Sequence, residues 1–138
     1  MYLGDTSALV RLYRKQVAPE WITAAKDGLI RICEPVLIEM LTMASGAHYR
    51  ELEGQLRREF PWLHVPDDPW SIVGDIRRSL AERSQHQGIS VADYLVVITA
   101  LHHDLTLLHE DAEFETVAEV VPELRQQRIS VLPESAQG

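Results

Sequence analysis

The sequence predicts an α/β fold in which a parallel β-sheet is flanked by helices on both faces. Short apolar runs of strand length alternate with longer segments whose apolar residues recur every three or four positions. Such alternation is typical of parallel strands joined by helical crossovers. The chain has 138 residues, of which 46% are hydrophobic, which is about one domain with a sizeable core.

Five apolar runs are expected to form the strands of this sheet. They are residues 2–4, 29–33, 60–65, 105–108 and 129–132, the last as an edge strand. We expect one domain over residues 1–133. A polar, flexible tail is expected over residues 134–138.

Helices are expected in the intervals between the strands. Residues 6–16 place Leu9 and Leu12 on one apolar face. Pro19 suits the first turn of the next helix, which is expected to stop at Gly28. The remaining expected helices run from Pro35 toward Gly46, through Leu52 and Leu56, from residues 67–69 to near Gly88, over residues 91–103 and over residues 113–120.

Composition narrows the classes of protein to which the chain can belong. The longest apolar runs are too short to span a bilayer, and the N-terminus lacks the basic and apolar regions of a signal peptide. Cys33 is the only cysteine, so an internal disulfide and a cysteine-rich zinc site are excluded, and a reducing cytosol is expected. The net charge of −8 argues against a broad basic face but does not exclude a nuclease, because active-site acids contribute to that total.

Acidic residues lie beside four of the apolar runs. Asp5 follows the first strand, Glu39 lies within the run 36–41, Asp93 precedes the run 94–97, and Asp111 follows the strand at 105–108. Ligands of α/β proteins bind outside the carboxyl ends of the parallel strands. Four carboxylates that converge there would form a site for a hard divalent cation such as Mg²⁺. That chemistry is typical of phosphodiester hydrolysis.

Each acid also has a purely structural interpretation. Asp5 is a good helix N-cap, and Asp93 lies three residues after Ser90, as in a variant capping box. Asp93 nevertheless leads an apolar helical stripe, where a carboxylate without a cation is costly. Glu39 is either a site residue or a solvent-facing residue at the helix edge. Asp111 lies ahead of a helix, where the dipole favours acids, so the prediction depends on the whole set.

Four segments of the chain resemble the PIN-domain ribonucleases, in particular the VapC-like toxins of bacterial type II toxin–antitoxin modules. The segments are residues 3–9 (LGDTSAL), 35–41 (PVLIEML), 91–100 (beginning VADY) and 105–114 (LTLLHEDAEF). Their order and spacing agree with that family over nearly the whole domain. Two positions depart from the family pattern: Gly4 replaces a usual apolar residue, and Glu113 replaces a common Asp.

The resemblance implies a PIN-like sheet and a catalytic acidic quartet of Asp5, Glu39, Asp93 and Asp111. Asp5, Asp93 and Asp111 would bind Mg²⁺ or Mn²⁺, and Glu39 would orient or deprotonate a water that attacks an RNA phosphodiester. Supporting roles are expected for Thr6, Ser7 and Glu113, and His109 lies near enough to Asp111 in sequence to touch the substrate.

Two functions other than RNA cleavage are alternatives for this sequence. An Asp-nucleophile phosphatase would also place an acid after the first strand, but it normally needs a second Asp where this chain has Ser7. A non-catalytic PIN scaffold that only binds a protein or RNA is the other alternative, and the complete acidic set argues against it.

The resemblance also implies partners: an RNA substrate, a cognate antitoxin and a second copy of the chain in a homodimer. An antitoxin Arg or Lys would be attracted to the acidic site. Tyr13, Trp21, Trp62 and Trp70 are candidates for such contacts, although burial in the core is expected for all four.

Overall fold

The computed structural model describes residues 1–134 as a five-stranded parallel sheet with the strand order β3-β2-β1-β4-β5. The strands are β1 (Tyr2–Gly4), β2 (Ile30–Cys33), β3 (Trp62–Leu63), β4 (Thr106–His109) and β5 (Gln126–Arg128). All four pairings are parallel, and Leu3 aligns with Arg31 of β2 on one side and Leu107 of β4 on the other. The α/β fold class predicted from the sequence is therefore confirmed.

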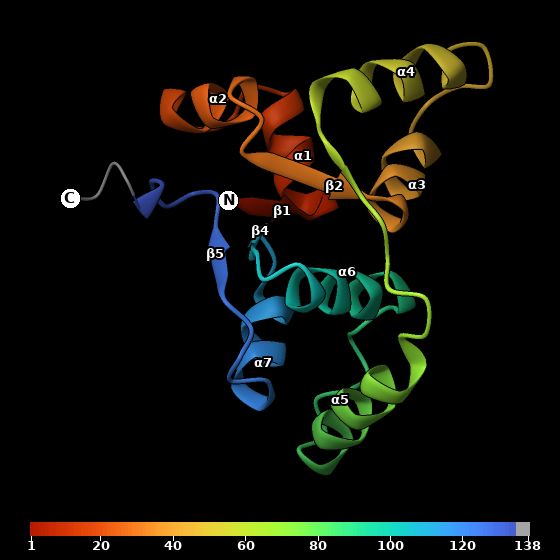
Figure 1. Cartoon of the computed structure of the whole chain (residues 1–138), viewed down its shortest axis with the longest axis vertical. Helices are drawn as coiled ribbons and strands as arrows, with labels where there is room; N and C mark the ends of the chain where they lie inside the picture. Colours follow the sequence, from red (N-terminus) through yellow and green to blue (C-terminus); the bar gives the residue numbers. More distant parts are fainter. Residues whose placement is uncertain (135–138) are drawn as a thin grey trace.

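Seven helices connect these strands and enclose the sheet within the described residues. They are α1 (Thr6–Tyr13), α2 (Pro19–Lys26), α3 (Glu34–Thr42), α4 (Tyr49–Glu59), α5 (Trp70–Glu82), α6 (Val91–His102) and α7 (Ala112–Val120). Figure 1 shows α1, α2 and α4 on one side of the sheet and α5, α6 and α7 on the other. Helix α3 contacts both α1 and α6, so it bridges the two layers at one end of the sheet.

The core is formed by the central strands and the inner faces of the helices. Leu3, Ile32 and Leu107 are fully buried on three neighbouring strands. Gly4 is also buried, and a Cβ built there would lie 3.0 Å from Cδ2 of Leu9, because Leu9 of α1 packs directly over the end of β1. This contact explains why the position departs from the apolar residue usual in the family.

Cys33 lies at the end of β2 and is fully buried. Burial raises the pKa of its thiol to about 12. The thiol is therefore unreactive at neutral pH, as expected for a cysteine that serves as a small packing residue.

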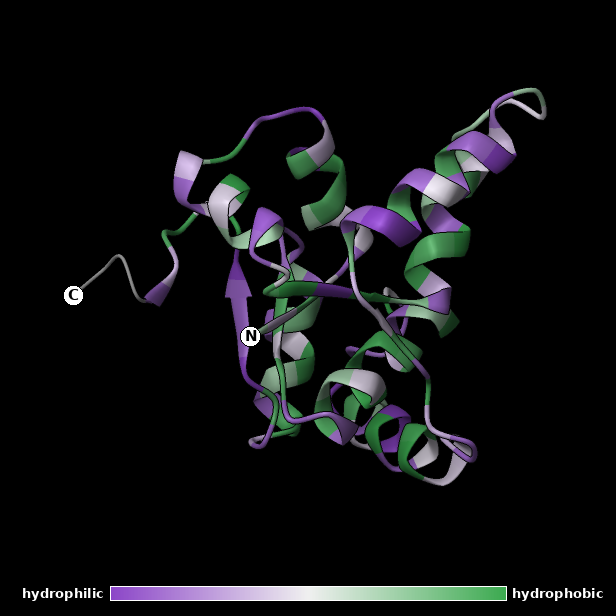
Figure 2. Cartoon of the chain, turned by 45° about the horizontal axis from the view of Figure 1, so that its top comes forward, coloured by the Kyte–Doolittle hydropathy of each residue, from purple (hydrophilic) through white to green (hydrophobic). Residues whose placement is uncertain are grey.

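The last strand differs from the sequence prediction. An edge strand was expected at residues 129–132, but β5 is the polar segment Gln126–Arg128, coloured as hydrophilic in Figure 2. Ile129 follows the strand in a turn, where its amide donates to the carbonyl oxygen of His109 at 2.8 Å and its side chain is buried. An edge strand can form by backbone pairing on one side and needs no run of apolar side chains. A prediction based on apolar residues therefore placed the strand three residues too late.

Three helices end earlier than expected. Helix α1 ends at Tyr13 and not at residue 16, α3 ends at Thr42, ahead of Gly46, and α5 ends at Glu82, well before Gly88. The chain leaves α5 through Ser84, which has a positive φ of 54°, and so turns without a glycine. Of the predicted tail, residues 135–138 lie outside the described part of the chain.

No helix within residues 1–134 combines the length and the apolar character needed to cross a bilayer.

Candidate active site

The candidate site lies at the carboxyl ends of β1 and β4, the two central strands. The chain leaves β1 toward β2 on one side and leaves β4 toward β5 on the other, so the strand order reverses between them. Such a switch point is where open α/β sheets form a crevice for ligands. Asp5 follows β1, and its amide donates to the carbonyl oxygen of Leu108 at 2.9 Å. Asp111 follows β4 by two residues, so both acids project from this edge.

Asp5 is the N-cap of α1 and is almost completely buried, with only 4% of the residue exposed. One of its oxygens, Oδ2, accepts hydrogen bonds from the amide of Ser7 at 3.1 Å and the hydroxyl of Ser7 at 2.8 Å. Desolvation by burial, together with repulsion from Asp93, raises the pKa of Asp5 to about 6. The capping interpretation is correct, and the same carboxylate also lies near a second acid.

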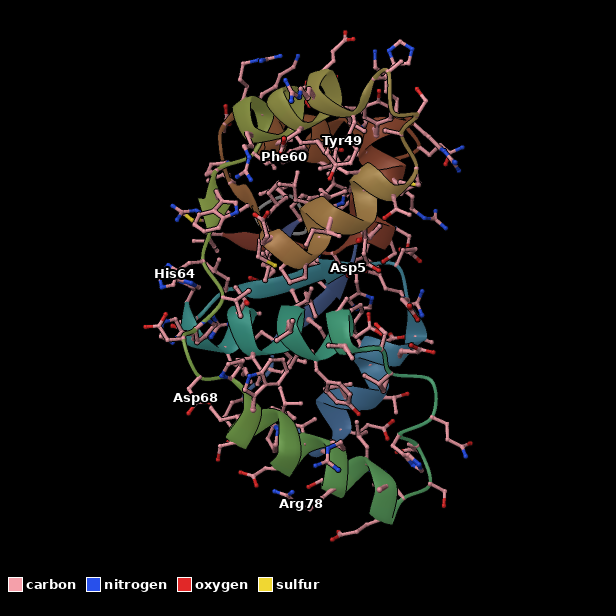
Figure 3. All side chains as sticks on the ribbon, turned by 90° about the vertical axis from the view of Figure 1, so that its right-hand side faces the viewer. Asp5, Tyr49, Phe60, His64, Asp68 and Arg78 are labelled. Carbon is pink, nitrogen blue, oxygen red and sulfur yellow. The ribbon has the colours of Figure 1, made fainter. Side chains whose placement is uncertain are left out.

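Glu39 is held by a hydrogen bond from the residue that follows Asp5. The hydroxyl of Thr6 donates to Oε1 of Glu39 at 2.8 Å. Helix α3 starts directly after β2 and carries Glu39 toward α1, and the residue is half-buried. Glu39 is therefore a partly exposed residue at the edge of α3 that a hydrogen bond fixes against α1. Figure 3 labels Asp5 between the ribbons of α3 and α6, the two helices that supply Glu39 and Asp93.

Asp93 forms the capping box that its spacing from Ser90 predicts. Its amide donates to Oγ of Ser90 at 3.1 Å, and its Oδ2 accepts from the amide of Ser90 at 3.0 Å. Asp93 is half-buried, and its charge contributes to the raised pKa values of both Asp5 and Glu113. Asp93 thus completes the capping box of α6. Its carboxylate also belongs to the acidic edge, the set of carboxylates of Asp5, Glu39, Asp93, Asp111 and Glu113 near the carboxyl ends of β1 and β4.

Asp111 and Glu113 complete this edge at the start of α7. Asp111 is the N-cap of α7, and its Oδ1 accepts from the amide of Glu113 at 3.0 Å. Partial burial, followed by repulsion from Asp111 and Asp93, raises the pKa of Glu113. A Cβ built on Gly88 would lie 2.5 Å from Oε1 of Glu113, so any larger residue at position 88 would displace this carboxylate from its present position.

His109 has a positioning role and does not face the substrate side. It is fully buried, and its Nδ1 accepts from the amide of Asp111 at 3.0 Å, while Nε2 lies 2.6 Å from Oε1 of Gln126. An imidazole that accepts at Nδ1 and donates at Nε2 is neutral. Burial lowers the pKa of His109, in agreement with this state. The expectation that His109 touches substrate is wrong, because no part of the ring is exposed.

The five acids share one electrostatic property: none has a cationic partner. Within residues 1–134, no side-chain nitrogen of Arg, Lys or His lies within 4.0 Å of a carboxylate oxygen of Asp5, Glu39, Asp93, Asp111 or Glu113. Neighbouring Glu110 differs, since its Oε2 pairs with Arg128 at 2.9 Å. Like charges gathered without a counter-charge are destabilising, and oxygen-only ligands suit Mg²⁺ or Mn²⁺. The residues present therefore fit a hard divalent cation.

The acids are nonetheless not drawn into a closed cluster. In the described part of the chain, no three of them have oxygens that all lie within 4.8 Å of one another. Electrostatic repulsion acts between pairs of them instead: Asp5 and Asp93, Asp93 and Glu113, and Asp111 and Glu113. Glu39 joins the edge through Thr6.

The predicted hydrogen bond from Ser7 to a ligand carboxylate is present, because Ser7 donates to Asp5; Ser7 also accepts from the amide of Glu110 at 2.9 Å. Two neighbours of the site were not predicted from the sequence. Gly88 lies against Glu113, and Arg128 binds both Glu110 and Glu115 next to the site. Arg128 carries no local signal, because its partners lie 18 and 13 residues away.

Apolar side chains beside the site are more exposed than predicted. Trp21 is fully buried, as expected, but Tyr13, Trp62 and Trp70 are exposed, and the prediction that they lie in the core is wrong. Tyr13 lines a groove of about 520 Å³ between α1, α3 and α4. Met40 of α3 and the residue that caps this helix, Met43, form part of its wall, so the groove runs along the helix that carries Glu39.

The chain belongs to the PIN domain family, which matches residues 2–120. It is similar to two curated proteins of Mycobacterium tuberculosis. Identity to ribonuclease VapC2 is 29%, over 98% of this chain and 96% of the relative, and identity to ribonuclease VapC21 is 25%, over 86% and 87%. The resemblance recognised in the sequence motifs is confirmed.

Solved structures share the fold at low sequence identity. VapBC-1 of nontypeable Haemophilus influenzae superposes with a TM-score of 0.74 at 12% identity, covering 94% of this chain and 98% of the other. VapBC2 of Rickettsia felis, solved bound to a promoter DNA fragment, has a TM-score of 0.70 at 18% identity, covering 92% and 97%.

Proposed function

We propose that this protein is a Mg²⁺- or Mn²⁺-dependent endoribonuclease and the toxin of a type II toxin–antitoxin pair, acting in the cytoplasm. The observation that carries the proposal is the gathering of five carboxylates, without cationic partners among the described residues, at the switch point between β1 and β4. The curated relatives are named ribonucleases, which gives the substrate class.

The roles of the acids follow from their surroundings. Asp5 and Asp93 would hold the ion directly, and Asp111 would do so directly or through water. When bound, such an ion lowers the pKa of a coordinated water and offsets charge on the leaving oxygen. Glu39, fixed at Oε1 by Thr6, would orient the attacking water or take its proton through Oε2. The water oxygen would form the new bond to phosphorus as the bond to the leaving ribose oxygen breaks.

The remaining polar residues support this arrangement. Ser7 holds Asp5 through both its amide and its hydroxyl, so the carboxylate keeps one orientation. The charges of Asp111 and Asp93 both act on Glu113, which would add a further oxygen ligand to the acidic edge. These contacts are the preorganisation that a cation site needs from the atoms around its ligands.

The two alternative functions fit the geometry less well. A phosphatase nucleophile must be accessible, whereas Asp5 is 4% exposed and accepts two bonds at Oδ2 from Ser7. A non-catalytic scaffold gives no reason to keep unpaired carboxylates together at a cost in stability. It predicts that the protein binds RNA or a partner but leaves RNA uncut in the presence of Mg²⁺.

We infer a cognate antitoxin and a second copy of the chain as partners. Several structural neighbours are toxin–antitoxin complexes. The exposed apolar groove between α1, α3 and α4 runs along the helix that carries Glu39 and would accept an antitoxin segment. A cationic residue of that segment would meet the unpaired acids and compete with the metal.

Cleavage of total RNA by the purified protein tests the function. We expect Mg²⁺ or Mn²⁺ to be required, EDTA to abolish cleavage, and mapped ends to lie in single-stranded or looped segments. A Glu59→Gln protein, altered at an exposed acid of α4, is the matched control and should cut like wild type. Undiminished cleavage in EDTA would exclude the metal mechanism, and binding without cleavage would favour the scaffold.

A further inference from the structure

Three histidines gather at the opposite end of α6 from the acidic edge. His102 and His103 close the helix, and His64 follows β3. Each can offer one ring nitrogen such that all three nitrogens lie within 4.8 Å of one another, and these are the only such group of three among residues 1–134. Figure 3 shows His64 and Asp5 toward opposite ends of α6.

The three rings also contact one another edge to face. Ring centroids lie 4.9 Å apart for His102 and His103, 5.1 Å for His64 and His103, and 5.9 Å for His64 and His102. Within the described residues no carboxylate oxygen lies within 4.0 Å of any of these rings. No ion pair with an acid therefore occupies the ring nitrogens of the trio, and imidazole nitrogens are common metal ligands.

One of the rings already has the hydrogen bond expected of a metal ligand. Nε2 of His103 lies 3.0 Å from the carbonyl oxygen of His64. A carbonyl only accepts, so Nε2 carries the proton, and a neutral ring then has its free lone pair on Nδ1. Metal-binding histidines commonly donate their second nitrogen to a backbone carbonyl in this way, which fixes the tautomer and the ring plane.

We propose that His64, His102 and His103 bind a borderline transition-metal dication such as Zn²⁺. Imidazole nitrogens suit Zn²⁺ and its neighbours, whereas Mg²⁺ requires oxygen ligands. With Zn–N bonds of about 2.0–2.1 Å, two nitrogens on a tetrahedral ion lie roughly 3.3 Å apart. His64 and His102 are exposed, so small side-chain rotations suffice to bring their nitrogens together.

The ion would fasten two segments that are distant in sequence. His64 begins the connection from β3 to α5, which runs past the end of α6 in Figure 1, and the other two ligands end α6. Because these three ligands meet only in the folded chain, an ion bound to them stabilises the folded state over the unfolded one. Zn²⁺ is thus expected to stabilise the fold without entering the acidic site.

The test uses tag-free full-length protein, because a polyhistidine tag would bind the same ions. After removal of metals, excess Mg²⁺ saturates the acidic edge, and Co²⁺ is titrated as a visible-absorption probe, followed by displacement with Zn²⁺. We expect one equivalent of Co²⁺ to bind wild type, Zn²⁺ to displace it, and Zn²⁺ to raise the melting temperature by a few degrees.

His102→Gln and His64→Gln should each weaken Co²⁺ and Zn²⁺ binding by at least about tenfold. His48→Gln, at an exposed histidine of the chain before α4, is the matched control and should bind like wild type. Circular dichroism checks the fold of each variant, and each altered side chain is exposed. Equal binding by wild type and both cluster variants, or no binding to wild type above Mg²⁺, would overturn the proposal. RNA cleavage in Mg²⁺ is unaffected by either result.

Discussion

Asp5 is both the cap of α1 and the most deeply buried acid of the candidate site. Burial and the charge of Asp93 raise its pKa from 3.8 to about 6, so the folded protein holds a proton on Asp5 that the unfolded chain releases between these values. Stability from this group is complete below about pH 4 and is lost as the pH rises through about 6. At neutral pH the ionised carboxylate therefore costs folding on the order of 3 kcal/mol.

Asp5→Asn should consequently stabilise the metal-free protein at pH 7.5 and have little effect at pH 4. Asparagine is also a good N-cap and keeps an acceptor for the amide of Ser7. Urea unfolding in EDTA at pH 4 and pH 7.5 measures the difference in unfolding free energy between the variant and wild type. The pKa of His109 is also shifted on folding, but both proteins contain His109, so its contribution cancels. Asp68→Asn, at an exposed acid, is the control. A variant less stable than wild type at both pH values would show that Asp5 has a capping role alone.

Glu39 offers a test of the catalytic assignment in living cells. Expression of the wild-type protein in a bacterial host should slow growth, and expression of Glu39→Gln should not. Glutamine keeps the size of the side chain and an oxygen for the hydroxyl of Thr6, but it removes the charge that orients or deprotonates water. Glu59→Gln, which likewise keeps an acceptor for Gln55, should remain toxic. Equal toxicity of the two variants and wild type would make Glu39 structural.

Local sequence signals were sufficient to identify the acids but not what surrounds them. Asp5 and Asp93 follow spacing rules for caps and strand ends, which operate within a few residues. The exposure of Trp62 and Trp70, the burial of His109 and the approach of Gly88 to Glu113 depend on contacts between distant segments. Residue type alone places an aromatic ring inside, so these positions required the folded structure.

Helix α6 lies between the two candidate metal sites, with Asp93 in its first turn and His102 in its last. The first turn both caps the helix and supplies a carboxylate to the acidic edge. Ser90→Ala removes the acceptor for the amide of Asp93 and should cost about 1 kcal/mol of stability, with cleavage largely retained. Asp93→Asn keeps an acceptor for the amide of Ser90, so it should be as stable as wild type or more so, but inactive.

Urea unfolding and RNA cleavage of these two variants separate the roles of the first turn. A destabilised but active Asp93→Asn protein would assign Asp93 to the cap alone.

Element boundaries were predicted well where periodicity was strong and poorly at the sheet edge. Helices α6 and α7 lie within one residue of their expected bounds, because buried apolar faces follow a helical repeat. Strand β5 has no buried face to mark it, and its three residues are all half-buried. The strand is placed by backbone pairing with β4, and Arg128 adds ion pairs with Glu110 and Glu115; no local pattern reveals either kind of contact.

At the scale of the whole molecule, the strand order explains why distant acids meet. Successive strands are added outward from β1 on one side and from β4 on the other, which leaves a crevice at the carboxyl ends of these two parallel strands, and α3 and α6 lie beside it. The site therefore draws on segments near residues 5, 39, 93 and 111. A sequence pattern indicates that strands are parallel, but the spatial order of the strands, and with it the crevice, is seen only in the folded structure.

A site assembled from four distant segments exists only in the folded state, so its ligand must stabilise the whole fold. Mg²⁺ at 100 times its dissociation constant should raise the free energy of unfolding by roughly 2.7 kcal/mol, a gain that already includes the repulsion among the acids that the ion offsets. Melting curves with and without Mg²⁺ measure this effect in wild type, Asp5→Asn and His102→Gln. Asp5→Asn should start from a higher melting temperature and gain little, whereas His102→Gln should gain as much as wild type. If Mg²⁺ protected all three forms alike, the ion would bind elsewhere, and the acidic edge would not be its site.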